Sequence, residues 1–189
     1  MFNSLGSIAT CENPTNQKNC CMDGRCVEDA DCDGGTLYEP MASSYKNSRS
    51  LHKGFVSLYP LMLGQIKDLD LVSQSLNLIK TELLSDYGLR SLSNLDQFYH
   101  FESDYYRGNV FVWQNYLLLR GLSKYHSKNP AAQDVYDLVR DALLSTVRAE
   151  YDKTHRLYEY YDDRTGTGRG KVNFSWSALV VLIMDETYL

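Results

Sequence analysis

Apolar residues recur at helical spacing from residue 51 onward, whereas residues 1–50 show no such periodicity. Two stretches carry the apolar stripe of an amphipathic helix. The first stripe consists of Phe55, Tyr59, Met62, Leu63 and Ile66, and the second consists of Val72, Leu76, Ile79 and Leu83. We predict two helices here, ended by a break at Asp86-Tyr87-Gly88 and followed by a loop through Asp104.

The stretch from residue 109 to residue 127 is apolar on nearly all sides, which is typical of a helix buried by its neighbours. Asn129-Pro130 then has the residue types of a helix start, with Asn as the N-cap and Pro in the first turn. The next apolar stripe consists of Val135, Leu138, Val139, Ala142, Leu143 and Val147. We therefore predict a buried helix followed by an amphipathic one.

The C-terminal part begins with a segment from Tyr151 to Gly170 that is rich in Tyr, Asp and Gly, and we predict a loop there. Ser175 is expected to cap a final apolar helix, which carries Trp176, Leu179, Val180 and Ile183. Strand-like alternation persists nowhere in the sequence, so the predicted fold class is all-α. We expect a Cys-rich, irregular or disordered head at residues 1–50 and a helical domain at residues 51–189.

The composition limits the possible partners. Of the 189 residues, 43% are hydrophobic, and the net charge is −5, so neither nucleic acid nor a membrane surface is an expected partner. The first residues lack the basic stretch and apolar run of a signal peptide, and we expect none in this chain. The longest apolar run, from Ala178 to Met184, is too short to cross a bilayer.

The cysteines are confined to the N-terminal stretch, as Cys11, Cys20, Cys21, Cys26 and Cys32. This cluster favours disulfide bonds made in an oxidising compartment, with one thiol left over. A zinc site and free thiols are the alternatives, although the stretch has no Cys-x-x-Cys pair and no His nearby. His52, His100, His126 and His155 have no ligand-like spacing, so we expect no metal site and no cofactor.

Fifteen tyrosines are an unusual number, and three of them flank Glu159 as Tyr158, Tyr160 and Tyr161. A carboxyl group among aromatic rings can act as an acid or a base, and Tyr hydroxyl groups can fix its orientation. The alternative is a surface Glu on a Tyr-rich loop. Glu159 is therefore a candidate for acid–base chemistry.

Arg107 follows Tyr105 and Tyr106 at the entrance to the predicted buried helix. Its forked guanidinium group can hold a carboxylate or donate hydrogen bonds to sugar hydroxyl groups, although a structural ion pair is the alternative. The Gly-x-Gly-x-Gly stretch at 166–170 is not read as a phosphate loop, because no strand is predicted before it and no Lys-Ser/Thr pair follows it. We expect these glycines to permit sharp turns and a close approach of the backbone to another surface.

Five blocks of the chain stand out by their order and spacing. They are HKGFVSLYPL at 52–61, DYGLRSLS at 86–93, YYRGNVF with NYL at 105–117, LYEYY with the three glycines at 157–170, and FSWS at 174–177. They resemble, in this order, the C-terminal part of the catalytic domain of glycoside hydrolase family 63, the family of mannosyl-oligosaccharide glucosidases (processing α-glucosidase I). Each block is weak evidence, but the set is highly specific and covers residues 51–189.

The resemblance implies an (α/α)6 toroid that hydrolyses α-glucosidic bonds with inversion, of which this chain would be a part, incomplete at its N-terminal side. The best-known members trim the terminal glucose from the N-glycan precursor oligosaccharide in the endoplasmic reticulum lumen. By the resemblance, Glu159 is the catalytic base, and Tyr105, Tyr106, Arg107 and Trp176 line the sugar pocket as stacking faces and hydrogen-bond donors.

The sequence also departs from the family pattern. The family's general acid is an Asp of an upstream motif that has no match here, so we expect no activity from this chain without the missing N-terminal part of the enzyme. Tyr106 stands where the family has Trp, Asn109 where it has Pro, and Phe111 where it has Trp. A non-catalytic helical glycan-binding module and a family 63 α-glucosidase of bacterial type are the alternative interpretations.

Overall fold

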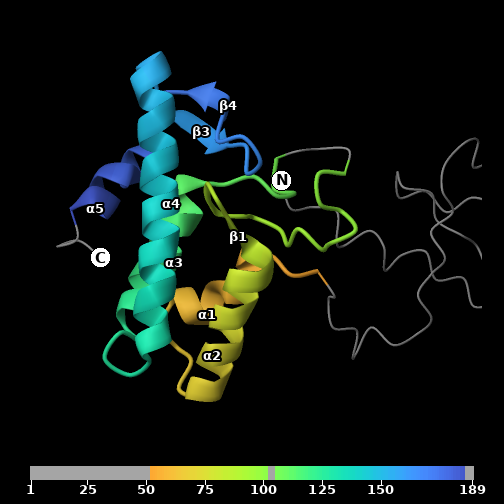
Figure 1. Ribbon diagram of the computed structural model, residues 1–189, viewed down its shortest axis with the longest axis vertical. Helices are drawn as coiled ribbons and strands as arrows, with labels where there is room; N and C mark the ends of the chain where they lie inside the picture. The colour runs from red at the N-terminus through yellow and green to blue at the C-terminus, as the bar shows by residue number, and fades with distance from the viewer. Residues whose placement is uncertain (1–51, 102–104, 186–189) are drawn as a thin grey trace, which may run out of the picture. The chain divides into compact units, whose positions relative to one another are not determined.

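The computed structural model describes residues 52–101 and 105–185, and about half of them are helical. Two small antiparallel sheets accompany the helices, so the expected all-α class is corrected to a mainly helical fold with short β-hairpins. The described residues belong to the unit Ser50–Leu189 (Figure 1). The predicted head at residues 1–50, with its five cysteines, lies outside the described residues.

Helical segments and strands alternate irregularly along the described part of the chain. The helical segments are η3 (Phe55–Leu58, 3-10), α1 (Tyr59–Met62), α2 (Leu69–Leu78), η4 (Ile79–Leu83, a π-helical turn), α3 (Val112–Ser123), α4 (Pro130–Thr154), η5 (Ser175–Leu179, 3-10) and α5 (Val180–Met184). The strands are β1 (Leu84–Ser85), β2 (Gly88–Leu89), β3 (Tyr158–Tyr161) and β4 (Gly168–Val172).

The first two predicted helices both form, the first of them as the short pieces η3 and α1. The chain leaves α1 through Gly64, whose φ of +68° is a left-handed conformation that glycine adopts without strain. α2 begins at Asp68, whose carboxylate accepts a hydrogen bond of 2.9 Å from the backbone N–H of Asp70. The apolar stripe of α2 and η4 is buried, as its spacing predicts, at Val72, Leu76, Ile79 and Leu83.

The two long helices α3 and α4 pack against each other and form the centre of the fold (Figure 1). Asn129 caps α4 as predicted, because its side chain accepts a hydrogen bond of 3.1 Å from the N–H of Ala131. α4 ends only at Thr154, with His155 at φ +54°, so the predicted loop start at Tyr151 is wrong. Residues 151–154 are polar or exposed, which is why no apolar stripe marks them as helical.

Most of the predicted Tyr-rich loop is a hairpin of β3 and β4, in which Tyr158 pairs with Val172 and Tyr161 with Gly168. Val110 joins the segment of β3 to the segment after β2 through backbone bridges to Tyr161 and Arg90. Strands of two to five residues are too short for a period of two to be visible in sequence. The pairing is therefore set by tertiary contacts.

The final helix forms as η5 and α5, but Ser175 does not cap it. Phe174 occupies the cap position without a side-chain hydrogen bond, and Ser175 is the first residue of η5. Ser177 instead ties this segment to the hairpin, since its hydroxyl group donates to the carbonyl oxygen of Tyr158. The C-terminal segment is thus attached directly to β3.

One apolar core joins the elements of this unit, with fully buried side chains from α1, α2, α3, α4 and β2. Gly121 of α3 lies so close to α1 that a Cβ atom there would be 2.5 Å from the carbonyl oxygen of Leu61. Within residues 52–101 and 105–185, the structure has no helix both long enough and apolar enough to span a bilayer.

Candidate active site

The carboxylate of Glu159 is half-buried and is held from two sides. The hydroxyl group of Tyr105 donates a hydrogen bond to Oε1 of Glu159. The backbone N–H of Lys171 donates to Oε2 over 3.1 Å. Each carboxylate oxygen can accept more than one hydrogen bond, so Glu159 keeps the capacity to accept a proton from a further donor such as water.

A β-bulge in β4 places the Lys171 N–H opposite Glu159. The register shifts between the pairs Tyr158–Val172 and Tyr160–Arg169, so β4 has two residues where β3 has only Glu159. Gly170, one of the two, has a φ of +73°. A Cβ atom at Gly170 would lie 2.7 Å from Oε2 of Glu159, so the backbone approaches the carboxylate as closely as glycine permits.

Tyr105 is a permanent hydrogen-bond donor in this pair. Burial and the hydrogen bond with Glu159 raise the pKa of Tyr105 far above its ordinary value of about 10. Loss of the phenolic proton would put a second negative charge against the carboxylate, which is the physical reason for the direction of the shift. The hydroxyl group therefore stays protonated at neutral pH and fixes the orientation of Glu159.

Beside this pair, aromatic rings form a continuous wall that includes Tyr106. Its ring stacks on Phe111 at a centroid distance of 4.6 Å, and Phe111 stacks on Tyr160 at 5.3 Å. The ring of Tyr105 packs edge-on against Phe111 at 5.2 Å and against Tyr160 at 5.2 Å. Since Tyr106 is 41% exposed, part of its apolar surface is open to a ligand.

Trp176 lies at the far end of the same wall of aromatic rings. Phe55 lies between Tyr106, at a centroid distance of 6.1 Å, and Trp113, at 5.4 Å. Trp113 in turn contacts Trp176 at 6.0 Å. Trp176 is 54% exposed, so this large ring offers an accessible surface at the start of η5.

Arg107 is held within its own loop. Its guanidinium group donates a hydrogen bond to the carbonyl oxygen of Phe101 and lies over the ring of Phe98, 5.7 Å from the ring centroid. These contacts brace the loop that carries Tyr105 and Tyr106. The structure thus brings Glu159 and Tyr105 together and places Tyr106 on the adjacent aromatic wall.

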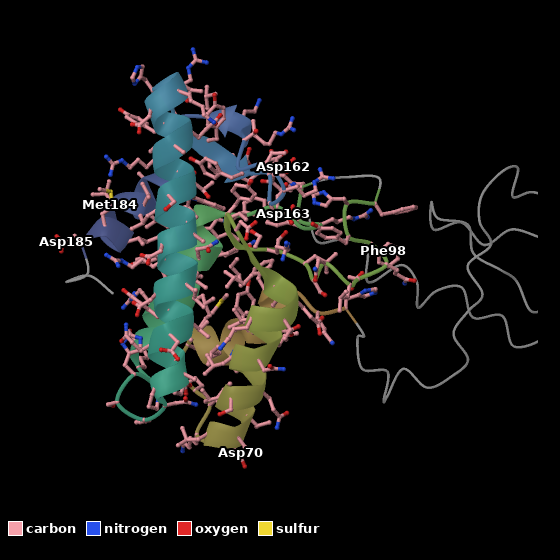
Figure 2. All side chains as sticks on the ribbon, in the orientation of Figure 1. Asp70, Phe98, Asp162, Asp163, Met184 and Asp185 are labelled. Atoms are coloured by element: carbon pink, nitrogen blue, oxygen red, sulfur yellow. The ribbon has the colours of Figure 1, made fainter. Side chains whose placement is uncertain are left out.

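Two further carboxylates, Asp162 and Asp163, follow β3 and were not identified from the sequence (Figure 2). Asp162 is buried; burial alone would raise its pKa, but hydrogen bonds from Arg164 and the charges of Arg164 and Arg169 lower the pKa overall. Asp163 is also buried, and its carboxylate contacts the side chains of Arg90, Tyr99 and His100 at hydrogen-bonding distance. Arg90 lies in the second sequence block, and this position was the signal that the sequence offered for a functional role. The sequence does not show that the partner of Arg90 is Asp163.

A carboxylate clamped by a tyrosine beside exposed aromatic faces is an arrangement suited to a carbohydrate-processing enzyme. The sequence model described as "Glycosyl hydrolase family 63 C-terminal domain" matches residues 27–186. The chain belongs to this family, which confirms the resemblance of its five sequence blocks. The match begins before the first block, which starts at residue 52.

The relatives extend far beyond the matched region. "Alpha-glucosidase 2" of Arabidopsis thaliana is 35% identical over 150 residues, which cover 72% of this chain and 19% of the relative. A probable mannosyl-oligosaccharide glucosidase of Schizosaccharomyces pombe is 36% identical over 146 residues, or 72% of this chain and 18% of the relative. The chain therefore spans less than a fifth of the length of these relatives.

A solved structure supports the same assignment. The GH63 mannosylglycerate hydrolase from Thermus thermophilus, in complex with glucose, superposes with a TM-score of 0.56 at 25% sequence identity. The match covers 71% of this chain and 32% of that chain.

Proposed function

We propose that this chain is the base-carrying, C-terminal part of an inverting α-glucosidase that removes the terminal glucose from the N-glycan precursor oligosaccharide. The single observation that carries the proposal is the Glu159 carboxylate, oriented by the Tyr105 hydroxyl group and the Lys171 N–H beside a wall of aromatic rings. The mannosyl-oligosaccharide glucosidase relative supports the choice of substrate. The enzyme would act in the endoplasmic reticulum lumen.

In this proposal Glu159 takes a proton from the water that attacks the anomeric carbon. The donors on its two oxygens fix the orientation of the carboxylate, and each oxygen retains the capacity to accept a further hydrogen bond, as a base for water requires. Tyr106 and Trp176 offer exposed aromatic surface to the sugar, and Arg107, which braces the loop of Tyr105 and Tyr106, donates hydrogen bonds to sugar hydroxyl groups. No cofactor is required for such a reaction.

The general acid would come from outside this chain. Inversion requires a second carboxyl group about 6.5–9.5 Å from the base, with room for water between them. Asp162 and Asp163 are unsuitable because both are buried and bonded to neighbouring side chains or backbone. We therefore propose that the remaining helices of an (α/α)6 toroid, supplied by a longer protein or a second polypeptide, complete the site and cover part of its face.

The test is a chimaera of the Schizosaccharomyces pombe relative in which residues 27–186 of this chain replace the matching segment. We expect the chimaera to release glucose from a glucosylated oligosaccharide and the isolated chain to release none. Glu159→Gln should lower kcat by about 100- to 10,000-fold, the usual contribution of a general base. Glu150→Gln is the matched control, because Glu150 lies on α4 and pairs with Lys153. An active Glu159→Gln chimaera would refute the proposal.

A second candidate substrate is mannosylglycerate, which the structural match to the Thermus thermophilus mannosylglycerate hydrolase favours. The same chimaera distinguishes the two candidates, since glucose is released from one substrate and mannose from the other. A glycan-binding module without catalysis is the third possibility. It predicts that glucose binding to the isolated chain is unaffected by Glu159→Gln.

A further inference from the structure

The carboxylate of Asp163 is fully buried and is bonded to three side chains. Its Oδ2 accepts hydrogen bonds of 2.6 Å from Nε of Arg90 and from the hydroxyl group of Tyr99. Its Oδ1 lies 2.7 Å from Nε2 of His100. A carboxylate is costly to bury unless it is paired and hydrogen-bonded, and these partners offset that cost.

These partners come from separate parts of the chain. Arg90 follows β2 and also donates to the carbonyl oxygen of Leu84 over 2.6 Å, which anchors the β1–β2 hairpin. Tyr99 and His100 belong to the loop before the candidate site residues 105–107. Asp163 follows β3, so its bonds link both hairpins to that loop.

Described contacts also join this cluster to the turn that follows Tyr105. The N–H of His100 donates to the carbonyl oxygen of Arg107 over 2.7 Å. At Gly108, a Cβ atom would lie 2.7 Å from Cε2 of Tyr99 and 2.9 Å from Nε2 of His100. The turn at Arg107-Gly108 therefore rests on the two side chains that Asp163 holds, and Tyr105 lies immediately before this turn.

The strand side is attached to the same cluster. Asp163 lies four residues after Glu159, and between them Tyr161 exchanges two backbone hydrogen bonds of 2.9 and 2.8 Å with Val110. These bonds hold the segment of Glu159 beside the segment that follows Tyr105, and Asp163 adds a second attachment between them through Tyr99 and His100.

We infer that Asp163 is a positioning residue of the candidate active site, which holds Tyr99 and His100 so that the Tyr105 hydroxyl group reaches Glu159. The inference deepens the proposed function, on which it rests for the role of Glu159 as the base. The carboxylate has no access to substrate, so it acts only through the loop.

The test is Asp163→Asn in the full 189-residue chain, with tyrosines labelled at Cζ and titrated by ¹³C NMR. In the wild type we expect Tyr105 to stay protonated at about pH 11, because contact with Glu159 and burial raise its pKa above the ordinary value. In Asp163→Asn we expect the pKa of Tyr105 to fall below its wild-type value, because the contribution of the Glu159 contact is lost while that of burial is retained. Tyr99 is an internal control: burial and its bond to Asp163 raise its pKa to about 12, so its pKa should fall in this variant under any interpretation.

Matched variants separate positioning from general destabilisation. Asp162→Asn alters the adjacent carboxylate, whose partners are Arg164 and Arg169, and should leave the titration of Tyr105 unchanged. Tyr99→Phe removes one bond to Asp163 and should lower the pKa of Tyr105 by a smaller amount, which provides the test if Asp163→Asn does not fold. Wild-type titration of Tyr105 in folded Asp163→Asn or Tyr99→Phe, or an equal change in Asp162→Asn, would overturn the inference.

The outcome is independent of the assignment of Glu159 as the base. The titration reports the surroundings of Tyr105, namely its burial and its contact with Glu159, and requires no turnover. Loss of catalysis in the Glu159→Gln chimaera tests the base. An unaffected Tyr105 in Asp163→Asn would therefore reject the positioning role while leaving the proposed function intact.

Discussion

The hydroxyl group of Tyr105 donates a hydrogen bond to Glu159, and this bond joins two segments that lie 54 residues apart in sequence. Sugar-pocket lining was the role implied for Tyr105 by the family resemblance. That role stays a prediction, and the contact adds a second one, because Tyr105 holds the carboxylate from the loop side, opposite the Lys171 N–H on the strand side.

Replacement of Tyr105 by Phe should therefore impair the base more than it impairs binding. A hydrogen bond to a charged group is worth about 1.5–3 kcal/mol, so we expect kcat of the chimaera to fall by about 10- to 100-fold. KM should change little, because the aromatic ring is retained. Tyr151→Phe, at an exposed position of α4, is the control, and equal losses of kcat in the two variants would contradict this role for Tyr105.

Gly170→Ala should destabilise the hairpin and displace Glu159. The backbone is left-handed at φ +73°, which costs about 1–2 kcal/mol for a residue with a side chain, and the added methyl group would meet Oε2 of Glu159. We expect the free energy of unfolding, measured with urea, to decrease by at least that amount. Lys171→Ala keeps the backbone N–H that binds Glu159 and should be nearly neutral; a neutral Gly170→Ala would contradict the argument.

The long helices could be predicted from sequence because their apolar stripes and caps are local signals. Asn129 begins α4 and caps it through its own side chain, so the start of this helix needs no distant contact. Its end was predicted four residues too early, because residues 151–154 are polar or exposed and carry no apolar stripe.

The site was only partly predictable, for a physical reason. The sequence placed Glu159 among tyrosines, but the partner that orients it is Tyr105, and a contact between distant segments leaves no periodic trace. The hairpin was missed because β3 and β4 are short and pair through a bulge. Asp163 was missed because a sequence does not show which cations and hydroxyl groups surround a carboxylate.

Asp162 should make the free energy of unfolding depend on pH in the acid range. Burial would raise its pKa, but its bonds to Arg164 and the charges of Arg164 and Arg169 lower the pKa in the folded state below the unfolded value of about 3.9. Its stabilising contribution is therefore present above the unfolded pKa and is lost as the pH falls through the folded pKa.

We expect the free energy of unfolding, measured with urea between about pH 2 and pH 7, to fall less steeply on acidification in Asp162→Asn than in the wild type. Asp137→Asn, at a site on α4 where the side chain is exposed, is the control. Identical pH profiles for the wild type and Asp162→Asn would show that the Arg164 and Arg169 contacts do not stabilise the ionised form.

Trp176 should contribute to substrate affinity through its exposed ring. Aromatic contacts are worth about 0.5–1.5 kcal/mol beyond the area they bury, so Trp176→Ala should raise KM of the chimaera by about 3- to 10-fold. Because Trp176 packs on the rings of Trp113 and Phe174, whereas Glu159 is oriented by other groups, kcat should be nearly unchanged.

The matched control for Trp176 is Tyr151→Ala, which removes an exposed ring from α4, beside His155, and should leave both constants unchanged. A rise in KM that appears in both variants would reflect a general loss of structure rather than a lost sugar contact. An unchanged KM in Trp176→Ala would remove this residue from the sugar pocket, whereas a loss confined to kcat would place it with the residues that orient the base.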